Sequence, residues 1–173
     1  METLSQITKK LGLIMRRTRY ALNWIVKLLR KHKIPFQISG GFAANIYGSN
    51  RSLADIDIEV SDKDVLNIQK SVKKYIIYGP MRYRDKEWDL LRMTLKYKNQ
   101  EIDICGIDSQ NIFDRQTKKW TKRKIDLPKS TRKKVYNLIV PIIPIKNLMS
   151  DKKKISRDVD IQDIKTLSNS LIH

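Results

Sequence analysis

Apolar residues along the chain follow two different periods, which together predict both helices and strands. Ala21, Ile25, Leu28 and Leu29 recur at three- and four-residue intervals, a spacing typical of a helix with one broad apolar face. Lysine and arginine crowd the end of this stretch, where cations suit the helix dipole, and Pro35 follows. The pattern therefore predicts a long N-terminal helix that ends before Pro35.

Other segments alternate between apolar and polar residues, which is the period of a half-buried strand. Residues 55–60 and 91–97 alternate in this way, and Asn99-Gln100 turns the second segment into the similar segment 101–104. We expect a β-hairpin here that feeds one sheet. Further elements are expected as strands at 36–38, at 75–78 (ended by Gly79-Pro80) and at 135–140, a short helix at 42–47, and a helix capped by Ser61.

The order of these elements predicts one α+β domain, a mixed sheet flanked by helices, over residues 1–173. The N-terminal helix falls within about 1–33 and the core within about 34–145. Two helices are expected within about 146–173, one from near Pro144 and one from near Asp158. The chain shows no internal repeat and no long linker.

Charge narrows the range of partners. The 173 residues include 36 Lys and Arg but only 18 Asp and Glu, which gives a formal net charge of +18. Such a field favours nucleic acid, nucleotides, anionic lipid or an acidic protein, although solubility alone would also account for it.

Other residues exclude several classes of protein. Cys105 is the only cysteine, so an intrachain disulfide and a cysteine-cluster metal site are excluded, and we expect a small buried side chain. No apolar run approaches the length of a membrane span, and residues 1–5 lack the order of a secretion signal. We therefore expect a cytoplasmic protein that does not contact a membrane.

Two short motifs suggest phosphate and metal chemistry. Gly40-Gly41 lies between a predicted strand and a predicted helix, where a glycine backbone can approach a ligand closely. Asp55 and Asp57 alternate along one strand, so both carboxylates project from one face. Like charges side by side favour a divalent cation between them, and Mg²⁺ suits oxygen ligands. Glu59 shares this face, and we expect it to be solvated.

A third carboxylate, Asp103, lies in a second strand with the same alternation. If the two strands pair, Asp103 joins Asp55 and Asp57. Such a trio suits phosphoryl transfer, in which carboxylates hold metal ions at a nucleoside triphosphate and one of them accepts the acceptor's proton. Acids that face water on an ordinary hairpin remain the alternative.

These residues resemble the polymerase-β-like nucleotidyltransferase superfamily. The likeness rests on Ile38-Ser-Gly-Gly41, a gap of thirteen residues, and Asp55-Ile-Asp57-Ile58, with Asp103 in the place of the third carboxylate. Arg51, four residues before Asp55, is similar to a basic residue of the AbiEii-type toxins, although Leu53 stands where that branch often has Ser or Thr.

The C-terminal stretch resembles the small nucleotidyltransferases that modify lincosamides. Lys146 opens a predicted helix after a short strand, and Asp160 and Asp163 form the Asp-x-x-Asp pattern of a later helix. By this resemblance Asp55, Asp57 and Asp103 are the catalytic and metal-binding residues. The resemblance implies nucleotide binding by Ser39, Gly40, Gly41, Arg51 and Lys146. Asp160 and Asp163 are expected to cap and brace the last helix, with Arg157 as an ion-pair partner.

The resemblance implies a Mg²⁺-dependent enzyme that moves a nucleoside monophosphate from ATP or another NTP to a hydroxyl acceptor. Lys118–Lys134 is dense in basic residues and contains Trp120, a composition that suits a nucleic-acid backbone as well as a solvated loop. RNA, such as tRNA, is therefore slightly favoured over a small molecule. A role in a toxin–antitoxin or defence system and a partner protein or homodimer fit the same resemblance. The alternative is a silent binding module with this fold.

Overall fold

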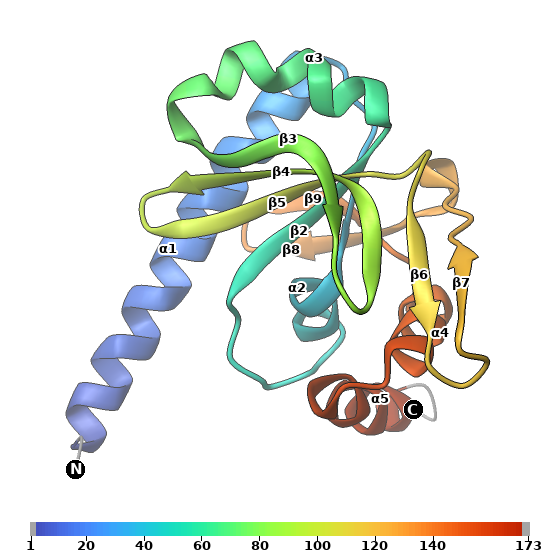
Figure 1. The fold of residues 1–173 in the computed structure, drawn as a ribbon. Helices are drawn as coiled ribbons and strands as arrows, with labels where there is room; N and C mark the ends of the chain where they lie inside the picture. The colour runs from blue at the N-terminus through green and yellow to red at the C-terminus, as the bar shows by residue number, and fades with distance from the viewer. Residues whose placement is uncertain (1–2, 171–173) are drawn as a thin grey trace.

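The computed structural model describes residues 3–170, which form an α+β arrangement of five α-helices, two short 3₁₀ helices and nine strands (Figure 1). Residues 1–2 of the predicted N-terminal helix region and residues 171–173 of the predicted C-terminal helix region lie outside the described residues. The helices are α1 (Leu4–Lys31), α2 (Gly40–Ile46), α3 (Asp62–Val72), α4 (Ile145–Ile155) and α5 (Asp158–Ser170). The strands are β1 (Gln37–Ser39), β2 (Asp55–Val60), β3 (Ile76–Arg84), β4 (Trp88–Tyr97), β5 (Gln100–Gly106), β6 (Asn111–Asp114), β7 (Lys119–Lys122), β8 (Thr131–Val135) and β9 (Leu138–Ile142).

All nine strands belong to one mixed sheet, which confirms the expected fold class. Its order is β7-β6-β4-β5-β2-β1-β9-β8, and β3 pairs with β4. The pairs β2–β5 and β1–β9 are parallel, whereas the other pairs are antiparallel. The expected hairpin joins β4 to β5, and Lys98 and Asn99 both have positive φ, as a two-residue hairpin turn requires.

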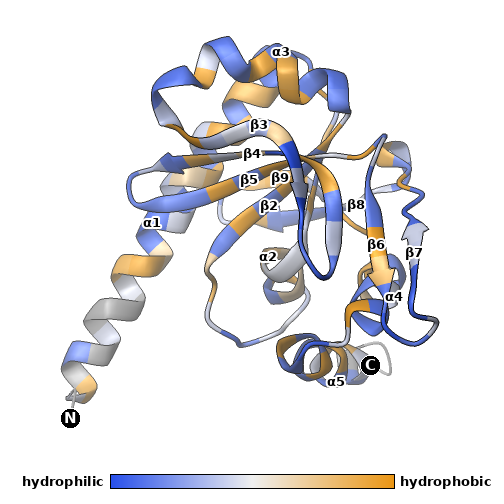
Figure 2. Cartoon of the chain, in the orientation of Figure 1, coloured by the Kyte–Doolittle hydropathy of each residue, from blue (hydrophilic) through white to orange (hydrophobic). Residues whose placement is uncertain are grey.

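The hydrophobic core lies between α1, α3 and one face of the central strands. Leu22, Ile25 and Leu29 of α1 are fully buried, as are the apolar residues of β2 and β5. Figure 2 shows the central strands alternating between hydrophilic and hydrophobic residues along their length. Because the apolar residues point toward α1 and α3, the polar residues of the same strands are left to the opposite face. The N-terminal half of α1 extends beyond the sheet (Figure 1).

Two strand predictions were wrong about where the chain stops pairing. Gly79 and Pro80 do not end the predicted 75–78 strand, because β3 passes through them with irregular register against β4. The predicted strand at 135–140 is interrupted by a hairpin turn at Tyr136, which has positive φ, so its first residue ends β8 and its last three belong to β9. None of the helices in residues 3–170 combines the length and apolar character of a membrane span.

The basic segment 118–134 is divided rather than continuous. It supplies β7 and β8, which stand at opposite ends of the strand order, and the loop between them. Within that loop Arg123 is not part of a basic surface, because its side chain is buried against Glu59 and Asp151. Both interpretations of this segment, a nucleic-acid contact and a solvated loop, are therefore wrong for Arg123.

Glu59 is also buried, which overturns the expectation that it is solvated. Its Oε1 accepts a hydrogen bond from Arg123 Nη1 at 2.5 Å, and its Oε2 accepts one from Gln37 Nε2 at 2.6 Å. Arg123 Nη2 also donates to Asp151 Oδ2 at 2.6 Å. Burial opposes the charge of Arg123, but the two carboxylates outweigh it and raise the pKa of this guanidinium further. The network ties the loop after β7 to β2 and α4.

We predict that Arg123→Met destabilises the protein, because it leaves Glu59 and Asp151 as unpaired buried charges. Removing one partner of a buried pair costs about 3–5 kcal/mol, which corresponds to a fall in Tm of roughly 10 °C for a chain of this size. Thermal unfolding measures the change, with Arg132→Met on the exposed side of β8 as the control. An unchanged Tm for Arg123→Met would show that the network contributes nothing to stability.

Candidate functional site

Three carboxylates meet at the centre of the sheet. β2 and β5 run parallel, with Asp57 opposite Asp103, and Asp55 lies two residues before Asp57 on the same face. One oxygen from each of Asp55, Asp57 and Asp103 lies within 4.8 Å of the others. The sequence expectation that Asp103 joins the first two acids is therefore confirmed in geometry.

The crowding of these acids changes their ionisation. Burial is the main cause that raises the pKa of Asp57 to about 8, and the charges of Asp55 and Asp103 add to it. Burial also raises the pKa of Asp55, again with help from Asp103, while Arg51 acts in the opposite direction. Without a cation Asp57 therefore holds a proton at neutral pH. A divalent cation with oxygen ligands would relieve the repulsion, so the donor set fits a metal such as Mg²⁺.

Asp103 is oriented by β4. Thr94 lies opposite Asp103 in the sheet and its hydroxyl donates to Asp103 Oδ1 at 2.5 Å. Arg92, two residues earlier on the same face, places Nη1 3.6 Å from Asp103 Oδ2. One oxygen of Asp103 thus accepts a hydrogen bond and the other faces a guanidinium.

Gly40 and Gly41 form the first turn of α2 rather than preceding it, which corrects the sequence expectation. Gly40 has a φ of +61°, and a Cβ there would lie 1.8 Å from Asp57 Oδ2. A Cβ on Gly41 would lie 2.0 Å from Arg51 Nη2, and the backbone N–H of Gly41 donates to Asp57. The two glycines therefore leave room for the side chains of Asp57 and Arg51. Ser39 precedes them and lines the same cavity as Asp57 and Arg51.

A second group of charges comes from the C-terminal helices. Asp163 is fully buried and accepts hydrogen bonds from Ser49 Oγ at 2.5 Å and from Arg51 Nε at 3.0 Å. Lys152 Nζ of α4 lies 2.7 Å from Asp163 Oδ2 and 3.1 Å from Asp160 Oδ1.

Asp160 completes this group at the start of α5. It is fully buried and accepts from the backbone N–H of Arg157 at 3.2 Å and from Arg157 Nε at 2.7 Å. The expectation that Asp160 and Asp163 cap and brace the last helix is confirmed. They also hold Arg51, Lys152 and Arg157 at the wall of one cavity.

Lys146 does not join this group. It is exposed in the first turn of α4 and does not line the cavity, whereas Lys152 does. Six residues of helix turn the chain by about 240°, so the two side chains face different directions. Sequence reasoning missed Lys152 because it belongs to the run Lys152–Lys154. A signal was present, since two acids on one buried helix face need a buried cation.

The cavity brings the two groups of charges together. It has a volume of about 340 Å³ and contains the carboxylate trio, the cations held by α5, and a wall from β3 and β4 with Tyr83, Trp88 and Arg92. Cys105 lines it too and is buried, as expected. This arrangement allows a polyanion to bind in the cavity across a metal ion that the trio would hold.

We predict that Asp57→Asn stabilises the metal-free protein, with a dependence on pH. The folded state holds the proton of Asp57 up to a pKa of about 8, whereas the unfolded chain releases it near 3.8. As pH rises through this window, the native state loses stability relative to the unfolded chain. The asparagine variant escapes this loss, so in EDTA its Tm should exceed that of the wild type by about 3 °C or more at pH 8 and by much less at pH 4.

Mg²⁺ supplies the second half of this test. Adding MgCl₂ at pH 8 should raise the Tm of the wild type and leave that of Asp57→Asn nearly unchanged, because only the intact trio binds the ion. Glu101→Gln is the control, since Glu101 is an exposed acid of the same strand as Asp103. Equal Mg²⁺ shifts in all three proteins would argue against a metal site at the trio.

Comparisons with known proteins show which solved structures share this fold. No protein-family model matches the sequence, and no curated protein matches it either. Among solved structures, a Thermotoga maritima protein assigned to the nucleotidyltransferases matches with a TM-score of 0.61 and 14% identity, over 97% of this chain and 96% of that chain.

Two structures of antibiotic-modifying enzymes match as well. The lincosamide antibiotic adenylyltransferase LnuA, with lincomycin bound, has a TM-score of 0.58 and 17% identity over 86% of this chain and 95% of its own. ANT(2")-Ia, in complex with adenylyl-2"-tobramycin, has a TM-score of 0.59 and 12% identity over 88% of each chain. At these identities the likeness concerns the fold, and the chain has the nucleotidyltransferase-like fold that its motifs predicted.

Proposed function

We propose that the protein is a Mg²⁺-dependent nucleotidyltransferase that moves a nucleoside monophosphate from ATP or another NTP to a hydroxyl acceptor. The observation that carries this proposal is the meeting of Asp55, Asp57 and Asp103 in a cavity whose other walls bear cations. An acidic trio alone would bind a cation, and a basic pocket alone would bind an anion. Their juxtaposition suits a metal-bound triphosphate.

The triphosphate would lie between the trio and the start of α2. Ser39, Gly40 and Gly41 are small there, and Arg51 is held beside them by Asp163. Lys152 and Arg157 extend the positive wall from the C-terminal helices. A guanidinium fixed by a carboxylate keeps its remaining N–H groups in place for a phosphate, which lowers the entropy cost of binding. Lys146, exposed outside the cavity, has no part in this arrangement.

The three carboxylates would hold the metal. Asp55 and Asp57 supply two oxygens and Asp103 a third, a hard donor set that suits Mg²⁺. When bound, the ion supplies charge stabilisation for the α-phosphate and the pyrophosphate.

Asp103 would receive the proton of the acceptor hydroxyl. The hydroxyl oxygen bonds to the α-phosphorus, the bond from this phosphorus to the oxygen of the leaving pyrophosphate breaks, and the proton passes to Asp103. Thr94 donates a hydrogen bond to Oδ1 of Asp103, and Arg92 Nη1 lies 3.6 Å from its Oδ2, so both neighbours hold the carboxylate in place.

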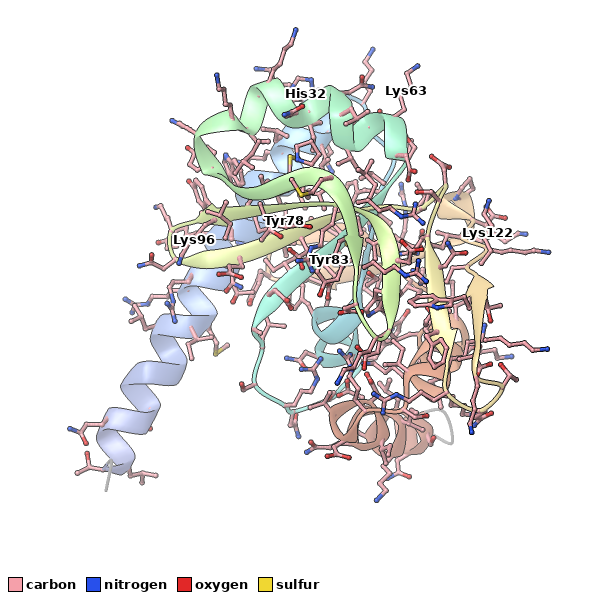
Figure 3. All side chains as sticks on the ribbon, in the orientation of Figure 1. His32, Lys63, Tyr78, Tyr83, Lys96 and Lys122 are labelled. Carbon is pink, nitrogen blue, oxygen red and sulfur yellow. The ribbon has the colours of Figure 1, made fainter. Side chains whose placement is uncertain are left out.

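The charge of the chain and the comparisons point to different acceptors. The net charge of +18 favours RNA, such as tRNA, and with it a role in a toxin–antitoxin or defence system. The positive charge is nevertheless spread widely, since Lys63, Lys96 and Lys122 project from different sides of the molecule (Figure 3). The names of LnuA and of the tobramycin complex support a small molecule instead. We also propose that the protein is cytoplasmic and that it acts with a partner protein or as a homodimer.

We predict that Asp55→Asn, Asp57→Asn and Asp103→Asn each lower the rate of label transfer from α-labelled ATP by about 100-fold or more. The acceptors offered are total RNA and a panel of lincosamides and aminoglycosides, with and without Mg²⁺. Glu101→Gln removes a neighbouring carboxylate outside the trio and should keep the wild-type rate. If the wild type and Asp57→Asn bind RNA equally well and neither of them transfers label, the protein is a silent binding module.

A further inference from the structure

The wall formed by β3 and β4 lies on the far side of Asp103 from the glycine turn. The strand order β4-β5-β2-β1 places β5, with Asp103, between Arg92 on β4 and the start of α2 after β1. If the triphosphate lies at α2, as in the function proposed above, this wall faces the acceptor. The inference that follows rests on that function for its orientation.

Arg92 is the charged residue of this wall, and it is held by stacking. Its guanidinium lies 3.6 Å from the ring centroid of Tyr83 and 5.0 Å from that of Tyr78. Figure 3 shows both tyrosines on β3 over the central strands. Trp88 lines the same cavity. A planar cation on an aromatic face is a common platform for an anion.

The hydrogen bonds of Arg92 are incomplete within the protein. Among residues 3–170, Asp103 is the one carboxylate within ion-pair distance of Arg92, 3.6 Å from Nη1, and Nε of Arg92 is buried without a hydrogen-bond partner. An unpaired buried N–H costs free energy. Arg92 is therefore not placed for a purely structural ion pair, unlike Arg82 on β3, whose Nε donates to Asp89 at 2.5 Å.

The other acids of this part of the cavity already have hydrogen-bond or ion-pair partners. Asp85 accepts hydrogen bonds from the hydroxyl of Tyr83 and from two backbone N–H groups. Glu59 and Asp151 are paired with Arg123, and Asp160 is paired with Lys152 and Arg157. Apart from the metal-binding trio, Asp85 is the one of these acids that is held by hydrogen bonds alone and not by a cation.

We propose that Arg92, on its tyrosine platform, is an acceptor subsite for a phosphate group, so that the acceptor is a sugar hydroxyl on a phosphorylated sugar. A guanidinium beside Asp103, the proposed proton acceptor, fits an acceptor that has a phosphate near its reacting hydroxyl. A ribose 5-phosphate unit has this chemistry, whether it ends an RNA chain or occurs as a free sugar phosphate. The positive charge of Arg92 disfavours a polycation at this position.

The test compares acceptors that differ in charge. Ribose 5-phosphate, ribose, a short RNA with a free 3′-hydroxyl and tobramycin are offered with α-labelled ATP and Mg²⁺. We expect kcat/KM for ribose 5-phosphate or RNA to exceed that for ribose and tobramycin by about tenfold or more. A better rate with RNA than with ribose 5-phosphate identifies a nucleic-acid end as the source of the phosphate. A preference for tobramycin would overturn the proposal.

Variants of Arg92 separate recognition from a structural role. Arg92→Gln should remove the preference for the phosphorylated over the neutral acceptor, Arg92→Lys should restore part of it, and KM for ATP should stay the same. Arg82→Gln, an exposed arginine of the neighbouring strand outside the cavity, is the control. An equal loss for ribose and ribose 5-phosphate in Arg92→Gln would mean that Arg92 only supports the sheet or Asp103.

Direct binding keeps the two proposals distinguishable. Calorimetry of ribose 5-phosphate without Mg²⁺ should show binding to the wild type that weakens by about tenfold or more in Arg92→Gln. Equal affinities, or no binding, would overturn the subsite. Calorimetry of MgATP tests the transferase proposal alone, so a protein that binds ribose 5-phosphate through Arg92 but not MgATP would refute the function and keep the subsite.

Discussion

The parallel pairing of β2 with β5 brings three carboxylates together, and their mutual repulsion is the main constraint on the cavity. Asp57 and Asp103 face each other across the pair, and Asp55 lies one step along the same face. Burial and mutual repulsion raise the pKa of Asp57 to about 8, so the apo site is an unfavourable arrangement that a cation would relieve. Gly40 leaves the space that the Asp57 carboxylate occupies.

Around the trio, other acids act by holding cations. Asp163 and Asp160 are fully buried on α5 and fix Arg51, Lys152 and Arg157 at the cavity wall. Glu59 and Asp151 fix Arg123 in the same way. Each pair consumes a carboxylate that would otherwise attract a positive ligand. The cavity therefore offers free negative charge mainly at the trio and positive charge elsewhere, a polarity that matches a metal-bound polyanion.

Local patterns predicted the elements that depend on short-range order. The alternation at residues 55–60 and 91–104 gave the hairpin and the two acidic strands correctly, because side-chain direction in a strand depends only on the position of the residue. The errors arose where a partner far along the chain decides the environment. Glu59 has the same alternation as Asp57, but Arg123, sixty-four residues later, buries and neutralises it. Nothing near Lys146 or Lys152 distinguishes the exposed lysine from the buried one.

The sequence by itself determined the α+β class, the glycine turn and the two alternating segments that carry Asp55, Asp57 and Asp103. It could do so because these features are encoded by neighbours within a few residues. Only the tertiary structure decided which cations face the trio, that β7 and β8 divide the basic segment, and that Arg92 stands beside Asp103 on a tyrosine platform. Those outcomes follow from strand order and burial. A charged side chain that is desolvated and paired with another residue behaves differently from the same side chain in water.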